Sequence, residues 1–102
     1  MKGSGKKSRA RILYNKEIAE GYFRLGLDWR APRVAAGQFV MVKITEGQDP
    51  LLRRPFGIYD ILNGFRGGIE ILYKVVGRGT LLLAGKYAGE SVDVLGPLGK
   101  GF

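Results

Sequence analysis

The strongest constraint in this chain is an alternation of apolar and polar residues with a period of two. Between residues 22 and 29, every second side chain is large and apolar, and the positions between them carry smaller or more polar side chains. The apolar set is Phe23, Leu25, Leu27 and Trp29. Successive side chains of a β-strand point to opposite faces, so this pattern predicts a strand with one buried face.

Five further segments have the length and composition of strands. They cover residues 10–18, 38–44, 54–62, 69–76 and 91–95. Residues 39–42 are continuously apolar, which predicts burial on both faces of that strand. Clusters of glycine or proline separate the segments, and the chain contains 17 glycines. Short strands with frequent turns predict an all-β domain, built as a small antiparallel barrel or sandwich.

One short helix interrupts the strands. Residues 80–86 read Thr-Leu-Leu-Leu-Ala-Gly-Lys, which places helix formers after a hydroxyl that can cap free backbone N–H groups. The helix is therefore expected to start at Gly79 or Thr80 and to cover about residues 79–86.

Length and composition limit what the chain can do. At 102 residues it is expected to form one domain around one core. It has no cysteine and no histidine, which excludes disulfides, thiolate nucleophiles, imidazole bases and the usual zinc or iron–sulfur ligand sets. Any redox chemistry is therefore expected to come from a cofactor. No apolar run approaches the ~20 residues of a membrane span, so we expect no membrane association and a cytoplasmic location.

The charge is strongly basic and unevenly distributed. The formal net charge is +8, and basic residues alternate with Gly and Ser in the first eleven positions. We interpret residues 1–9 as a flexible basic tail and residues 10–102 as the folded domain. A basic barrel also suggests an alternative, the binding of single-stranded nucleic acid, for which the stacking platforms would be Tyr22, Phe23, Phe56 and Tyr73.

Residues 50–58, Pro-Leu-Leu-Arg-Arg-Pro-Phe-Gly-Ile, resemble an anion clamp beside an aromatic ring. Arginine offers a planar fork of donors to phosphate oxygens. Pro55 disfavours helical backbone at Arg54, which should therefore lie on an extended strand. These residues suggest a phosphorylated, flat, aromatic ligand.

A second anion site is suggested where the strand at 69–76 meets the helix. Val76-Gly77-Arg78-Gly79-Thr80 places two glycines directly before and within the expected helix start. Unpaired backbone N–H groups and the positive end of the helix dipole favour phosphate at such a place.

Three spaced blocks in this order resemble a known family. They are Arg54-Pro55-Phe56-Gly57, then Leu72-Tyr73-Lys74, then Gly79-Thr80, and the longer runs 52–55 and 71–80 carry the narrower resemblance. Together they resemble the FAD-binding barrel of the ferredoxin reductase superfamily, and more narrowly the electron-transfer subunit of bacterial dihydroorotate dehydrogenase. The resemblance implies a six-stranded antiparallel Greek-key barrel with one short helix, binding FAD in an extended pose along one side.

The same resemblance implies the cofactor-binding residues. Arg54 would pair with the FAD pyrophosphate, with Pro55 beside it, and Phe56 would take the aromatic position next to the isoalloxazine. Leu72, Tyr73 and Lys74 match the stretch that lines the flavin or its ribityl chain. Gly79 and Thr80 match the amide-rich turn that takes a phosphate. Gly57 stands where the family usually has a serine whose hydroxyl reaches the reactive edge of the flavin.

In the complete family members, a nicotinamide-binding domain and a cysteine cluster for a [2Fe-2S] centre follow this barrel. Neither is found in this chain, so we expect it to be a component of an NAD-linked, FAD-dependent oxidoreductase that is inactive alone. The implied electron route runs between NAD(H), FAD, [2Fe-2S] and a dihydroorotate dehydrogenase catalytic subunit. A domain of this fold that no longer binds a ligand is a third possibility.

Overall fold

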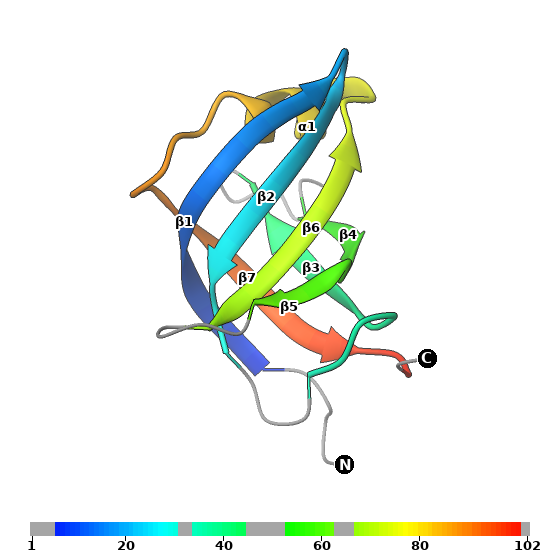
Figure 1. The fold of residues 1–102 in the computed structure, drawn as a ribbon. Coiled ribbons are helices and arrows are strands. Elements are labelled where there is room, and N and C mark those ends of the chain that lie inside the picture. The colour runs from blue at the N-terminus through cyan, green and yellow to red at the C-terminus, as the bar shows by residue number, and fades with distance from the viewer. Residues whose placement is uncertain (1–5, 31–33, 45–52, 63–66, 101–102) are drawn as a thin grey trace.

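The computed structural model describes residues 6–30, 34–44, 53–62 and 67–100. It contains seven strands and one helix: β1 (Lys6–Ala19), β2 (Tyr22–Asp28), β3 (Phe39–Lys43), β4 (Arg53–Gly57), β5 (Asp60–Leu62), β6 (Gly68–Lys74), α1 (Gly77–Ala84) and β7 (Ser91–Leu98). The predicted all-β fold with one short helix is confirmed (Figure 1).

All strands belong to one antiparallel sheet in the order β4-β3-β7-β1-β2-β6-β5. The last strand, β7, returns to lie between β1 and β3, as in Greek-key connections. The two outer strands of this order, β4 and β5, are consecutive in the chain and are joined through Ile58 and Tyr59. The sheet therefore closes on itself as a barrel (Figure 1).

The predicted count of six strands was one too low, because the segment expected as a single strand at 54–62 changes partner in its middle. Its first half, β4, pairs with β3, and its second half, β5, pairs with β6. At the change, the Ile58 N–H donates to Gln38 O at 2.8 Å and the Tyr59 N–H donates to Glu70 O at 2.8 Å. This bend forms the seam that closes the barrel.

The continuous apolar run at 39–42 was wrongly expected to be buried on both faces. Val40 and Val42 of β3 are fully buried, whereas Phe39 and Met41 are only partly buried. The run therefore follows the ordinary alternation of a barrel strand, with one face in the core. That core consists of inward side chains from every strand except β5, closed by Leu83 of α1.

The sheet extends further at both chain ends than the sequence indicated. Strand β1 begins at Lys6, which pairs with Gly96, so residues 6–9 of the expected tail are part of the sheet. Residues 1–5 lie outside the described part of the chain. Strand β7 continues through Pro97 to Leu98, three residues beyond the predicted end.

A polar cluster covers the outer face of β1, β2 and β6. The Tyr14 ring lies over Gly26, where any Cβ would collide with it. The Tyr14 hydroxyl donates to Glu70 Oε2 at 2.6 Å, and Arg24 Nε lies 3.4 Å from the same oxygen. Burial, together with the Glu70 carboxylate, raises the pKa of Tyr14 to about 12. The nearly buried carboxylate of Glu70 is therefore both hydrogen-bonded and ion-paired.

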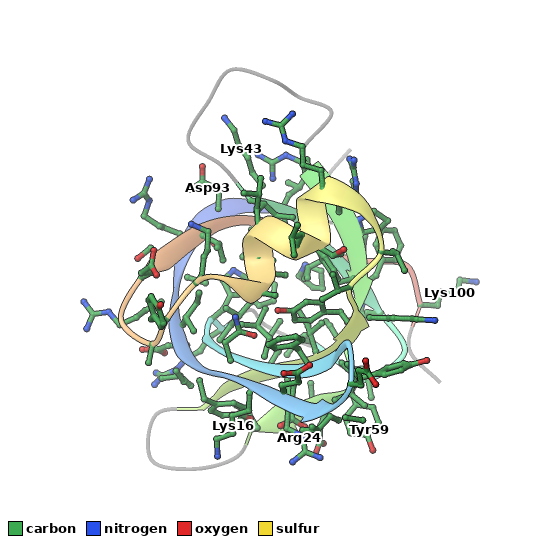
Figure 2. The ribbon with its side chains drawn as sticks, turned by 90° about the horizontal axis from the view of Figure 1, so that it is seen from above. Lys16, Arg24, Lys43, Tyr59, Asp93 and Lys100 are labelled. Carbon is green, nitrogen blue, oxygen red and sulfur yellow. The ribbon has the colours of Figure 1, made fainter. Side chains whose placement is uncertain are left out.

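Helix α1 lies across one end of the barrel. Figure 2 looks down the barrel from that end. It covers residues 77–84 and not the expected 79–86. Thr80 is not its N-cap. The cap is Val76, and the Thr80 hydroxyl accepts the Val76 N–H at 2.6 Å from within the first turn. None of the helices in the described residues has the length and apolar character needed to cross a membrane.

Candidate cofactor site

Arg54 and the N-terminus of α1 lie next to each other at one end of the barrel. A Cβ placed on Gly79 would lie 3.6 Å from Arg54 Nε, 3.7 Å from Arg54 Cγ and 3.5 Å from Ile44 Cδ1. The structure thus brings together the two anion sites expected from residues 50–58 and 76–80, which are far apart in sequence. Any side chain at Gly79 would fill the space between the helix and Arg54.

The first turn of α1 is suited to an anion. Its N-cap, Val76, makes no side-chain cap hydrogen bond, and the turn contains no acidic residue. The backbone N–H groups of Gly77, Arg78 and Gly79 have no partner within the helix, because the first N–H groups of any helix lack one. Gly77 has φ +86, a conformation that side chains rarely adopt, so glycine is required where the strand turns into the helix. The donors and the adjacent guanidinium fit a phosphate or pyrophosphate group.

The adjacent arginine, Arg53, faces the other way. Arg53 pairs with Lys43 and Arg54 pairs with Val42, so the alternation of β4 puts their side chains on opposite faces. Arg53 Nη1 is buried and has no hydrogen-bond partner among the described residues. The two arginines therefore start from opposite faces of β4, and Arg54 is the one that approaches Gly79.

A groove lies further along the same segment, at the seam of the barrel. It has a volume of about 540 Å³ and is lined by Gly37, Gln38, Gly57, Ile58, Tyr59 and Leu72. Arg54 and Gly57 are three residues apart on an extended strand, a distance of roughly 10 Å. By the alternation of the strand, Gly57 lies on the same face of β4 as Arg53 and Pro55, and the Arg54 side chain starts from the other face.

Of the residues expected at the site, Gly57 and Leu72 line this groove. Gly57 is exposed, and a Cβ there would meet nothing within 4 Å, so the fold does not require glycine at this position. Gly37, Gln38, Ile58 and Tyr59 were not predicted. Tyr59 is exposed. It directly follows residues 50–58 in the sequence, and an aromatic residue at that place is a signal that could have indicated it.

Phe56 and Tyr73 lie in the core. Phe56 is 7% exposed and Tyr73 is 6% exposed. Their rings meet edge to face with centroids 5.8 Å apart, and Phe23 stacks on Tyr73 at 5.4 Å. Burial raises the pKa of Tyr73 to about 12, against a smaller lowering by its hydrogen bond to Asn15. The Tyr73 hydroxyl is therefore a neutral donor, 2.9 Å from Asn15 Oδ1.

The remaining expected residues lie around the site in different ways. Pro55 is exposed on the outer face of β4. Lys74 is exposed on β6, with Nζ 5.5 Å from the centre of the Tyr22 ring. Thr80 is buried, and its hydroxyl also donates to Val76 O at 3.0 Å, so its hydrogen bonds lie within the helix start.

Sequence comparison gives matches over almost the whole chain. The electron transfer subunit of dihydroorotate dehydrogenase B (NAD(+)) from Bacillus velezensis is 40% identical over 99 residues, which are 95% of this chain and 38% of the relative. The subunit of the same name from Bacillus caldolyticus is 43% identical over 98 residues, 94% of this chain and 38% of the relative. The chain thus spans well under half the length of these curated relatives. No protein-family model matches it.

Solved structures give the same fold. An NADH-dependent reduced ferredoxin–NADP oxidoreductase matches 91% of this chain and 35% of its own with a TM-score of 0.75 and 30% identity. The Amycolatopsis cytochrome P450 reductase GcoB matches 94% of this chain and 29% of its own with a TM-score of 0.74, and at 24% identity it supports the fold alone.

The alternative of nucleic-acid binding is not supported. Of the four proposed stacking platforms, Phe56 and Tyr73 are buried and Phe23 is partly buried against Tyr73, which leaves Tyr22 exposed. The relatives named above are redox proteins. By sequence, this chain is similar to part of the electron transfer subunit of bacterial dihydroorotate dehydrogenase B, and its fold is similar to the barrel of a ferredoxin–NADP oxidoreductase.

Proposed function

We propose that this chain is an FAD-binding electron-transfer domain that holds the cofactor along β4. The observation that carries the proposal is the approach of Arg54 to Gly79 at the start of α1, where the N-cap residue Val76 makes no side-chain cap hydrogen bond. Arg54 and the N–H groups of Gly77 to Gly79 would bind the pyrophosphate, and the groove at Gly57 and Leu72 would receive the isoalloxazine. FAD supplies the redox chemistry when bound, and the protein binds, orients and electrostatically tunes it.

The buried residues of the expected set would act from behind this surface. Phe56 and Tyr73 pack beneath β4 and would keep the strand in place. The Thr80 hydroxyl fixes the start of α1 and so would orient the N–H groups ahead of it. Pro55 and Lys74 would border the ligand from the exposed faces of β4 and β6.

A ligand panel tests this function. The purified chain is titrated separately with FAD, FMN and a short single-stranded oligonucleotide, and flavin fluorescence and thermal unfolding are followed. FAD is expected to raise the unfolding temperature more than FMN, because only FAD carries the pyrophosphate. A thermal shift with the oligonucleotide that falls steeply with salt, and none with FAD, would contradict the proposal.

We further propose the physiological setting from the names of the relatives. In a complete protein this domain would pass electrons between NAD(H), FAD and a [2Fe-2S] centre, with a dihydroorotate dehydrogenase catalytic subunit as partner. Co-purification of that catalytic subunit with the protein from its native cells would test the partner. A cytoplasmic location stays a prediction, to be checked by cell fractionation.

A further inference from the structure

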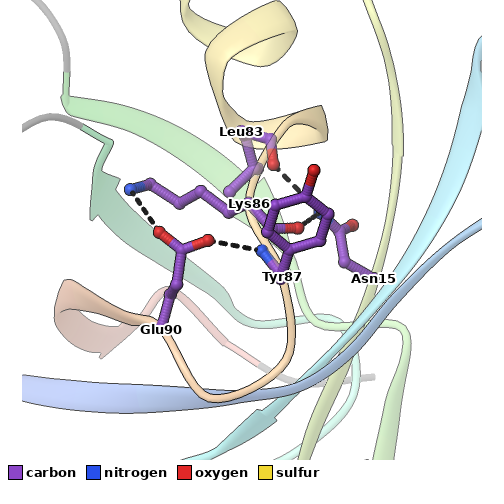
Figure 3. A network of polar contacts seen from close by, with 5 residues as sticks. All are labelled: Asn15, Leu83, Lys86, Tyr87 and Glu90. Atoms are coloured by element: carbon purple, nitrogen blue, oxygen red, sulfur yellow. Dashed lines mark hydrogen bonds and ion pairs between the residues drawn. The ribbon is translucent and has the colours of Figure 1, made fainter.

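Asn15 of β1 connects α1 to the barrel through three hydrogen bonds. Its Nδ2 donates to Leu83 O at 2.9 Å and to Lys86 O at 3.0 Å. Its Oδ1 accepts the Tyr73 hydroxyl at 2.9 Å. Figure 3 shows the amide between the end of the helix and the segment that follows it. One side chain thus joins β1, β6 and the C-terminal end of α1.

The orientation of this amide follows from its partners. Both carbonyl oxygens can only accept, so the NH₂ group must face them and the amide oxygen must face Tyr73. The Tyr73 ring is itself held between Phe23 and Phe56. The amide is therefore fixed from the core side as well as from the helix side.

The C-terminal end of α1 is closed by two short backbone hydrogen bonds, from the Gly85 N–H to Leu82 O at 3.2 Å and from the Lys86 N–H to Leu83 O at 3.0 Å. The last carbonyl groups of a helix lack partners within it, and α1 has no basic residue in its last turn. Its C-cap, Gly85, has φ −88, so the left-handed cap that often closes a helix is absent. Asn15 adds a side-chain donor to Leu83 O and is the side chain that links this end of the helix to β1.

The segment after the helix is held as well. Glu90 accepts the Tyr87 N–H at 2.7 Å and lies 3.9 Å from Lys86 Nζ, as drawn in Figure 3. The Gly89 N–H donates to Ile12 O at 2.8 Å, on the same strand as Asn15. Strand β1 therefore anchors both the end of α1 and the turn beyond it.

We propose that Asn15 is a positioning residue for the pyrophosphate, acting through α1 without touching the ligand. This inference rests on the proposed FAD function. A helix of eight residues is about 12 Å long and moves as a unit, so fixing its C-terminal end also fixes the N–H groups at its start. Those N–H groups must stay beside Arg54 to bind the same anion.

The test compares FAD with riboflavin, which has the same ring and no phosphate. Asn15→Asp keeps the shape but places oxygens against two carbonyl groups, and Asn15→Ser removes the amide without adding charge. Each variant should lose about tenfold in FAD affinity and stay within about twofold for riboflavin. Tyr73→Phe, which frees the amide on one side, should show a smaller loss in the same direction.

The control variant is Ser8→Ala on the same strand. It removes one hydrogen bond from Trp29 Nε1, at 2.7 Å, and should leave the ratio of FAD to riboflavin affinity unchanged. Equal losses for FAD and riboflavin in the Asn15 variants, or no loss for either, would overturn the proposal. If the unaltered chain does not bind FAD, it is the proposed function that fails.

A ligand-free measurement tests the positioning itself. Without any flavin, amide hydrogen exchange at Leu81 and Leu83 should be faster in Asn15→Ser than in the unaltered chain or in Ser8→Ala. Unchanged exchange at these two amides would overturn the role of Asn15 in holding α1.

Discussion

Arg54 and Gly79 illustrate how the fold creates a site from residues 25 positions apart. Arg54 is placed by β4 and Gly79 by α1, and the two meet at the rim of the barrel. The guanidinium brings charge and the helix start brings N–H groups directed at one point. A phosphate contacted by both would be held more strongly than by either alone.

Arg54→Ala is expected to weaken FAD binding by about 10 to 150-fold, because a charge-assisted contact to phosphate is worth roughly 1.5 to 3 kcal/mol. Fluorescence titration measures the affinity. Arg53→Ala is the matched comparison, since its side chain starts from the other face of β4, the one that carries Gly57, and it should cost less affinity than Arg54→Ala. An unaltered affinity in Arg54→Ala would remove Arg54 from the site.

Gly79→Val should reduce FAD affinity by about tenfold or more while the barrel stays folded, because the new side chain fills the space in front of Arg54. The matched control is Gly85→Val at the other end of α1, where φ is −88 and the nearest atom, Leu82 O, is 3.6 Å from an added Cβ. Equal losses of affinity in both variants would indicate a general effect on the helix.

Individual site residues were harder to predict than the site itself. The sequence motifs name whole segments, and a motif taken as a unit does not say which of its residues are exposed and which are buried. Tyr73 and Leu72 are adjacent in one motif, yet the first lies in the core and the second lines the groove. Successive side chains of a strand point to opposite faces, so these two residues could not both line the groove.

At the scale of the element, α1 depends on a hydroxyl in its first turn. The Thr80 hydroxyl was expected to cap a helix that starts at Gly79 or Thr80, and instead it bonds back to the cap residue Val76 from within the helix. In the sequence, Thr80 stands directly before the apolar residues 81–83, as a capping hydroxyl would. The helix was therefore placed at residues 79–86, two residues beyond its observed position at 77–84.

Thr80→Val should lower the free energy of unfolding by about 1 kcal/mol, because it leaves the Val76 N–H without its acceptor at the start of the helix. Urea unfolding followed by circular dichroism measures the change. Thr80→Ser keeps the hydroxyl and should recover most of the loss. A variant Thr80→Ser as unstable as Thr80→Val would show that the methyl group, and not the hydrogen bond, stabilises the helix start.

At the scale of the whole molecule, the alternating patterns were enough to predict an all-β barrel with a single short helix. They missed the extra strand: Gly57 stands directly before the partner change at Ile58 and Tyr59, but a single glycine does not by itself mark the end of a strand. They also did not show that one face of β3 is only partly buried, because Phe39 and Met41 on that face are as apolar as Val40 and Val42 in the core.

Stability should fall at high pH. The pKa of Tyr73 is raised to about 12 in the folded chain, against about 10 when unfolded. Between these values the unfolded chain loses the proton and the folded chain keeps it, so stability decreases by up to about 2.7 kcal/mol as the pH rises through that interval. Urea unfolding at pH 9 and pH 11.5 measures the fall. Tyr73→Phe should show a smaller fall, and an identical fall would contradict the assignment.

The connection at Ile58 and Tyr59 both closes the barrel and forms part of the groove proposed for the ligand. The chain crosses there from one neighbouring strand to the other, so the ring of strands is closed by a single short connection. The groove lies over that connection, with Ile58 and Tyr59 among its walls. A ligand bound in this groove would contact the connection that closes the barrel. Binding would therefore stabilise the closed barrel at the point where the two outer strands of the sheet order, β4 and β5, are joined.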